Sequence, residues 1–259
     1  MDEPLLQIKN LPSGICLLTL NRPGKRNALN VPLMSAVVEA VEIANADDRV
    51  RSIVLCGAGP VFCAGLDLKE AADSEKAEES GAWVARLLNA VHQSPKVTFA
   101  AVHGAAMAGG AGLMACCDMV IAAEGTRIGF PEVRRGLVAA LIMAFLTRRV
   151  RESDARELVL LAEPIDAARA HDIGLVNRVV PPNHLIDESS KLAGLAAQGA
   201  PEAIAHTKQL LDALRPRPVA DDMILAQKLH HAARTSGEAQ EGIAAFLEKR
   251  KAQWVENNE

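Results

Sequence analysis

Residues 97–123, VTFAAVHGAAMAGGAGLMACCDMVIAA, contain the pattern that decides the fold. Val97–Val102 is a continuous apolar run and predicts a buried strand. A glycine-containing turn follows, a short helix is expected over Gly109–Cys117, and Met119–Ala123 predicts the next strand. Alternation of strand, helix and strand is typical of α/β proteins, in which successive strands pair in parallel. We therefore predict an α/β fold around this segment.

The residues before this segment predict more strands and helices. Leu5–Lys9 and Ile15–Asn21 are aliphatic runs separated by Pro-Ser-Gly, a pattern that predicts a hairpin. A helix is expected from the N-cap Asn30 to about Asp47, because apolar residues recur there at helical spacing. Further along the chain we expect a buried strand at Arg51–Gly57, a mobile loop or frayed helix in the polar stretch 70–82, and a helix near Trp83–His92.

From Ser153 onward the pattern becomes mainly helical. Only Leu175–Val180 looks extended in this part of the chain. The expected helices are Asp154–Leu161, Leu185–Gln198, Pro201–Leu214, Asp221–Thr235 and Glu238–Trp254. We therefore expect an α/β core at residues 1–180 and a helical C-terminal region at 181–259.

Composition excludes several classes of protein. The 259 residues are 49% hydrophobic and 23% charged, which is typical of a globular protein and excludes a disordered one. A net charge of -4 and an aromatic content of 3% argue against nucleic-acid binding, which needs basic surface and often aromatic stacking. No apolar run reaches the roughly 18 residues of a membrane span. The five cysteines are an odd number in apolar stretches, so we expect buried, reduced thiols in a cytoplasmic protein.

Two glycine-bearing turns are the strongest candidates for chemistry. Phe62–Glu70 follows the strand that ends near Cys56, and His103–Gly112 follows the strand that ends at Val102. Backbone N–H groups at a helix start are unpaired, and glycine lets a ligand approach them closely. Two such turns side by side would form an oxyanion hole. The alternative is that both turns are packing devices only.

Glu132 is the candidate acid or base. It follows the apolar residues Ile128–Pro131, whose burial would raise its pKa toward neutral. The alternative is a structural ion pair with Arg134 or Arg135. Asp67 and Glu70 have the spacing of a capping box, so we expect Asp67 to cap a helix. No metal site is predicted, because the histidines are scattered and the adjacent pair 230–231 points in two directions on a helix.

Five motifs, in order along the chain, resemble those of the crotonase (enoyl-CoA hydratase/isomerase) superfamily. They are Asn21-Arg22-Pro23 with Asn27-Ala28-Leu29-Asn30, Phe62–Leu68, Gly104–Asp118, Phe130-Pro131-Glu132 and Glu241–Arg250. The resemblance implies a spiral core of repeated ββα units, an acyl-CoA thioester substrate, no separate cofactor, and assembly into a homotrimer or a dimer of trimers.

The resemblance also implies roles for single residues. The thioester oxygen would accept hydrogen bonds from the N–H groups of Leu66 and Gly109, and Glu132 would be the acid/base. The CoA and acyl moieties would contact Lys25, Arg26, Ala28, Ala64, Leu68 and Gly110, and the CoA phosphates would lie near Phe246 and Lys249, from the same or a neighbouring subunit.

The reaction remains open between two chemistries. Many hydratases of this family use a second glutamate, and its position is Gly112 here. One carboxylate suffices for moving a double bond, which favours an isomerase. The segments 109–113 and 132–137 are similar to methylglutaconyl-CoA hydratase-like members, which favours a hydratase and a branched substrate whose second carboxylate would meet Arg134 or Arg135. A non-catalytic acyl-CoA binding protein is the third hypothesis. Val138–Met143 departs from the family pattern, so the wall of the acyl pocket is expected to differ.

Overall fold

The computed structural model describes residues 3–71, 74–215 and 218–256. Its main sheet has six strands among these residues, and all neighbours pair in parallel except the antiparallel pair β1 and β2. In spatial order the strands are β1 (Leu6–Leu11), β2 (Ile15–Leu20), β3 (Ser52–Gly57), β4 (Val97–Val102), β6 (Met119–Ala123) and β9 (Arg178–Val180). The predicted α/β class, the N-terminal hairpin and the parallel pairing are confirmed.

A second, smaller sheet lies beside the first. It contains β5 (Ala105–Met107), β7 (Arg127–Gly129) and β8 (Ile165–Asp166). β5 follows directly on β4, and β7 follows directly on β6, so the chain passes from one sheet to the other in successive repeats. The strand pair β4–β5 leads into a helix at Gly109, which is the ββα unit expected of this spiral fold.

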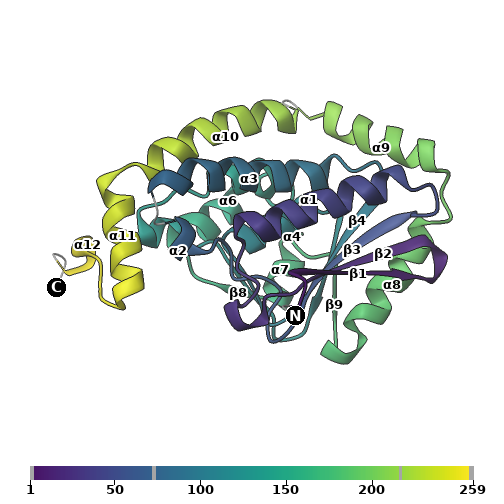
Figure 1. The fold of residues 1–259 in the computed structure, drawn as a ribbon, viewed down its shortest axis with the longest axis horizontal. Coiled ribbons are helices and arrows are strands. Elements are labelled where there is room, and N and C mark those ends of the chain that lie inside the picture. The colour runs from purple at the N-terminus through teal and green to yellow at the C-terminus, as the bar shows by residue number, and fades with distance from the viewer. Residues whose placement is uncertain (1–2, 72–73, 216–217, 257–259) are drawn as a thin grey trace.

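The helices cover both faces of the main sheet (Figure 1). They are α1 (Val31–Ala46), α2 (Leu68–Ala71), α3 (Ser74–His92), α4 (Gly109–Cys116), α5 (Ala140–Leu146), α6 (Glu152–Arg156), α7 (Ala167–Asp172), α8 (Leu185–Ala196), α9 (Pro201–Ala213), α10 (Val219–Arg234), α11 (Gly237–Glu248) and α12 (Gln253–Glu256). A π-helical turn, Glu157–Leu161, follows α6, and the 3-10 turns are η1 (Pro12–Gly14), η2 (Pro23–Lys25), η3 (Glu132–Arg135) and η5 (Pro182–His184).

Each face of the main sheet has its own apolar core. Side chains alternate along β3, so Ile53 packs with α1 and α3 on one face while Val54 packs with α8 on the other. α10 lies over α3 and α5 and adds a further layer (Figure 1). All five cysteines are free and buried, as expected. None of the helices in the described ranges is long and apolar enough to cross a membrane.

Two of the predicted segments differ in the structure. Residues 70–71 end α2 and residues 74–82 belong to α3, so the expected loop is largely helical; residues 72 and 73 lie outside the described part. The long helix predicted over Glu238–Trp254 is interrupted, because Lys249 adopts φ 57°, a left-handed conformation that ends α11.

Candidate active site

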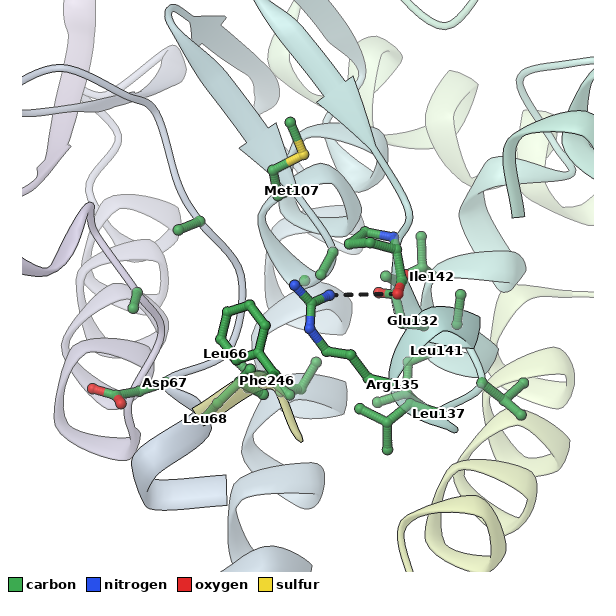
Figure 2. Close-up of a pocket in the computed structure, with 18 of the residues that line it drawn as sticks. Leu66, Asp67, Leu68, Met107, Glu132, Arg135, Leu137, Leu141, Ile142 and Phe246 are labelled. Carbon is green, nitrogen blue, oxygen red and sulfur yellow. Dashed lines mark hydrogen bonds between the residues drawn. The ribbon is translucent and has the colours of Figure 1, made fainter. Parts of the chain in front are cut away.

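A cavity of about 570 Å³ lies where the two glycine turns, η3, α5 and α11 meet (Figure 2). Most of its lining is apolar, and Glu132 and Asp67 are the acidic residues among its described lining residues. A concave, largely apolar site with few polar groups is typical of a small-molecule binding site. The cavity contains Leu66, Gly109 and Glu132, so the structure brings together the three residues predicted to act on the substrate.

The two glycine turns are joined by main-chain hydrogen bonds. Cys63 N donates to Ala105 O at 3.2 Å, and Met107 N donates to Cys63 O at 3.0 Å. These bonds fix the chain before Leu66 against the chain before Gly109.

The N–H groups of Leu66 and Gly109 are neighbours at the cavity wall. A β-carbon built on Gly109 would lie 3.7 Å from Leu66 N, and one built on Gly65 would lie 3.3 Å from Gly109 N. Among the main-chain hydrogen bonds of the described residues, neither N–H has an acceptor. Two adjacent unpaired donors that face one cavity suit a developing oxyanion.

The backbone at both turns is held in conformations that side chains disfavour. Gly65 has φ +94°, and its missing side chain would meet Met107 O at 2.7 Å. Ala108, which precedes α4, has φ 50° and ψ -125° although it is not a glycine. Strained backbone of this kind concentrates at functional sites, where the surrounding structure fixes it.

Glu132 begins η3 and is only 8% exposed. Its Oε2 has no hydrogen-bond partner among the described residues. Burial raises the pKa of this carboxyl to about 7, against smaller lowering effects from a hydrogen bond to its own backbone and from the charge of Arg135. The predicted pKa near neutrality is therefore confirmed.

Among the described residues, neither Arg134 nor Arg135 lies within ion-pair distance of Glu132, so the alternative of a structural ion pair is not supported, although the charge of Arg135 does act on Glu132. Arg134 instead pairs with Glu163 outside the cavity. Arg135 Nη1 donates to Pro131 O at 3.4 Å, the dashed line in Figure 2. The Arg135 guanidinium carbon lies 4.4 Å from the centre of the Phe246 ring.

Gly112, the position of the second glutamate in many relatives, is packed against α5. A β-carbon there would lie 2.8 Å from Cγ1 of Ile142. Ile142 lines the cavity and Gly112 does not. An aliphatic side chain therefore lies where a second carboxylate would have to enter.

The residues predicted to contact CoA and acyl moieties fall into two groups. Two of them do not line the cavity. Gly110 packs on the first turn, where its β-carbon would meet Cys63 O at 2.4 Å, and Lys249 is an exposed residue at the end of α11. The predicted residues that line the cavity are Lys25, Arg26, Ala28, Ala64, Leu68 and Phe246. Phe246 reaches the cavity of its own chain.

The predicted capping role of Asp67 stays a prediction, while both acidic residues of the expected capping box make contacts outside α2. Asp67 forms an ion pair with Arg22 at 3.1 Å. Glu70 Oε1 accepts a hydrogen bond from Val31 N at 3.0 Å, so it caps α1 rather than its own helix. The Glu70 side chain, at the end of the first glycine turn, thereby connects α2 to α1.

Sequence reasoning missed part of the cavity wall. Met107, Val84 and His230 also line it, and burial lowers the pKa of His230 to about 4, so this imidazole is neutral at neutral pH. Residues 137–142 line the cavity as well. They overlap Val138–Met143, whose departure from the family pattern had indicated that the wall of the acyl pocket differs here.

Comparison with known proteins places this fold and site in a class. The sequence matches the enoyl-CoA hydratase/isomerase family model over residues 10–257. A Thermus thermophilus protein named as an enoyl-CoA hydratase is 39% identical over 244 residues, 91% of this chain and 95% of that protein. The 2,3-dehydroadipyl-CoA hydratase of Escherichia coli is 34% identical over 237 residues, 91% of this chain and 93% of that protein.

Solved structures agree with the sequence comparisons. The enoyl-CoA hydratase/isomerase of Pseudoalteromonas atlantica superposes with a TM-score of 0.87 at 32% identity, covering 96% of this chain and 99% of that one. The fold is therefore that of the crotonase superfamily. The chain belongs to the enoyl-CoA hydratase/isomerase family and is an enzyme of that family.

Proposed function

We propose that this enzyme adds water to a 2-enoyl-CoA thioester. The observation that carries the proposal is the shared cavity: two unpaired N–H groups, from Leu66 and Gly109, face the same space as the buried carboxyl of Glu132. Hydration needs these two functions, a site for a negative oxygen and a group that moves a proton.

The proposed reaction has two proton transfers. The Glu132 carboxylate takes a proton from water as the water oxygen bonds to C3, and the electron pair of the double bond moves toward the thioester oxygen. The N–H groups of Leu66 and Gly109 stabilise that oxygen as an enolate. Protonated Glu132 then gives its proton to C2, the carbonyl re-forms, and the carboxylate is restored.

The pKa of about 7 supports this double role. A group whose pKa lies near the working pH is present in both protonation states and can accept and return a proton with little cost. In this proposal the N–H groups of Leu66 and Gly109 stabilise the negative enolate oxygen, and Glu132 alone transfers the proton. A second carboxylate at position 112 is therefore not required.

Substitution of Glu132 tests the proposal. Glu132→Gln keeps the shape of the side chain and removes proton transfer, so we expect hydration of crotonyl-CoA to fall about 10²- to 10⁴-fold. CoA-ester affinity, measured by calorimetry, should change little. Full activity in this variant would overturn the assignment of Glu132.

A second candidate function is double-bond isomerisation. It is favoured by Ile142, which occupies the space beside Gly112 and leaves Glu132 as the one lining carboxyl, among the described residues, without an ion pair. An isomerase would convert 3-enoyl-CoA to 2-enoyl-CoA without uptake of water, and mass spectrometry in H₂¹⁸O distinguishes the two reactions. CoA-ester binding with no turnover of either substrate type would indicate the non-catalytic hypothesis.

The proposal also covers the cofactor, the acyl group, the location and the assembly. CoA enters as part of the substrate, and no separate cofactor takes part in the steps above. A branched, methylglutaconyl-like acyl group is the substrate that the motifs favour. We also propose a cytoplasmic location and a homotrimer or a dimer of trimers, the assembly that the family resemblance implies.

A further inference from the structure

The 3-10 geometry of η3 places Glu132 and Arg135 on one side of the turn. Side chains three residues apart eclipse one another in a 3-10 helix. Both residues line the cavity (Figure 2). Arg134, one position before Arg135, is exposed and pairs with Glu163. One turn therefore presents an acid and a cation to the same space and directs the neighbouring arginine away from it.

The guanidinium of Arg135 has donor groups that the protein does not use. Its hydrogen bond to Pro131 O is long, at 3.4 Å, and its buried Nε has no partner among the described residues. Phe246 covers one face of the guanidinium. A guanidinium has five N–H donors in a planar fork that matches a carboxylate, so Arg135 can bind an anion from the cavity side.

Arg135 lacks a close ion pair with the acidic lining residues that the structure describes. Asp67 is paired with Arg22, and Glu132 attracts Arg135 electrostatically without forming an ion pair with it. Burial keeps Glu132 partly protonated at neutral pH and lowers the pKa of Arg135, the sign of a cation without adequate solvation. A partly buried cation without a close ion-pair partner is costly, and a ligand anion would relieve that cost.

We propose that Arg135 is a specificity-determining residue that binds a second carboxylate, carried by the acyl chain of the substrate a few bonds beyond the reacting double bond. The preferred substrates are then monothioesters of unsaturated dicarboxylic acids. This inference rests on the proposed hydration and names the acyl class for the same site. Arg134, whose partner is Glu163, has no part in it.

A matched pair of substrates tests the inference. Glutaconyl-CoA and 2-pentenoyl-CoA have the same chain length and differ by a terminal carboxylate in place of a methyl group. We expect wild-type enzyme to hydrate glutaconyl-CoA with the higher kcat/KM, mainly through a lower KM. Hydration of neither substrate would contradict the proposed function itself, whereas hydration of both without preference would overturn only the role of Arg135.

Substitutions assign the preference to one side chain. In Arg135→Gln we expect the ratio of kcat/KM for glutaconyl-CoA to that for 2-pentenoyl-CoA to fall about 100-fold, the usual scale for removing one partner of a buried charge pair. Arg135→Lys should recover part of this ratio, since it keeps the charge but not the fork. Arg134→Gln is the matched control and should leave the ratio unchanged.

A structural role for Arg135 would give a different result. Loss of packing or a shifted pKa at Glu132 would lower both rates together and leave the ratio near the wild-type value, which would overturn the proposal. If Arg135→Gln does not fold, calorimetry on the wild-type protein with glutaryl-CoA and pentanoyl-CoA provides an independent measurement. Equal affinity for the two saturated esters would also overturn it.

Discussion

Glu132 shows how a single residue acquires a working pKa from its surroundings. Ile128, Phe130 and Pro131 precede it, and these apolar neighbours already predict desolvation of the carboxyl. The positive charge of Arg135 opposes the effect of burial, but burial dominates and the pKa reaches about 7. The role of Arg135 was not predictable, because the sequence does not say which of the two arginines after Glu132 turns into the cavity.

We predict a specific pH dependence of stability at Glu132. The pKa of Glu132 in the folded protein is about 7, whereas the ordinary pKa of a glutamate is 4.5, so the folded state binds more protons between these values. The free energy of unfolding should therefore fall as pH rises through this window, by about 3 kcal/mol in total. Glu132→Gln should lack this component, and urea titrations of both proteins at pH 5 and pH 8 measure the difference.

Tight packing at Gly112 leads to a second prediction. Gly112→Ala places a methyl group against Ile142, and overpacking of this kind should lower stability by about 1 to 3 kcal/mol. Ile142→Ala removes Cγ1, the atom that the new methyl group would meet, so the double variant should lose less than the sum of the two single losses. A double-mutant cycle by urea unfolding measures this; additive losses would show that the two side chains do not compete for space.

At the scale of elements, long and strongly patterned segments were predictable. β4 and β6 have the predicted bounds, and α1 starts at the predicted cap, where Asn30 Oδ1 accepts from Leu33 N at 3.2 Å. The strands of the small sheet were missed because each has only two or three residues, too few to show a period of two. The small sheet helps to position the second glycine turn, because β5 lies within that turn. The sequence therefore predicted the site residues but not the sheet that positions them.

The contact between α11 and η3 positions Phe246 and Arg135 together, and glycine makes it possible. A β-carbon on Gly242 would lie 2.4 Å from the carbonyl carbon of Arg135. We predict that Gly242→Ala displaces α11, lowers stability by about 1 to 3 kcal/mol and weakens CoA-ester binding. Thermal unfolding and calorimetry measure both effects.

Gly237 provides the control on the same helix. It is the first residue of α11, and a β-carbon there would meet nothing within 4 Å. Gly237→Ala should therefore be neutral or slightly stabilising. Equal losses in both variants would indicate a general effect of alanine in α11 rather than the contact with η3.

For the whole molecule, the outer helices of the C-terminal region leave large apolar side chains uncovered. α9 has no buried residue, and Leu214 after it is 74% exposed. Further exposed side chains on α9 and α10 are Leu210, Leu211, Ile224, Leu225 and Leu229. Large exposed apolar patches mark interaction surfaces, which supports the proposed assembly of several copies.

The assembly can be tested through these side chains. Light scattering of the wild-type protein should show a trimer or hexamer, and the pair Leu225→Lys with Leu229→Lys should shift the protein toward smaller species, because charges would have to be buried in the contact. A stable wild-type monomer would contradict the proposal. The control Ile43→Lys changes an exposed residue on α1 and should leave the assembly intact.

The hydrogen bond between Glu70 and Val31 links two segments that are far apart in the sequence. Leu68, the first residue of α2, lines the cavity, so a displacement of α2 away from α1 would break this bond and leave the Val31 N–H without its acceptor. Ligand binding that holds α2 in place should therefore also protect the first turn of α1. We expect deuterium uptake at the Val31 amide to slow when a CoA ester is bound.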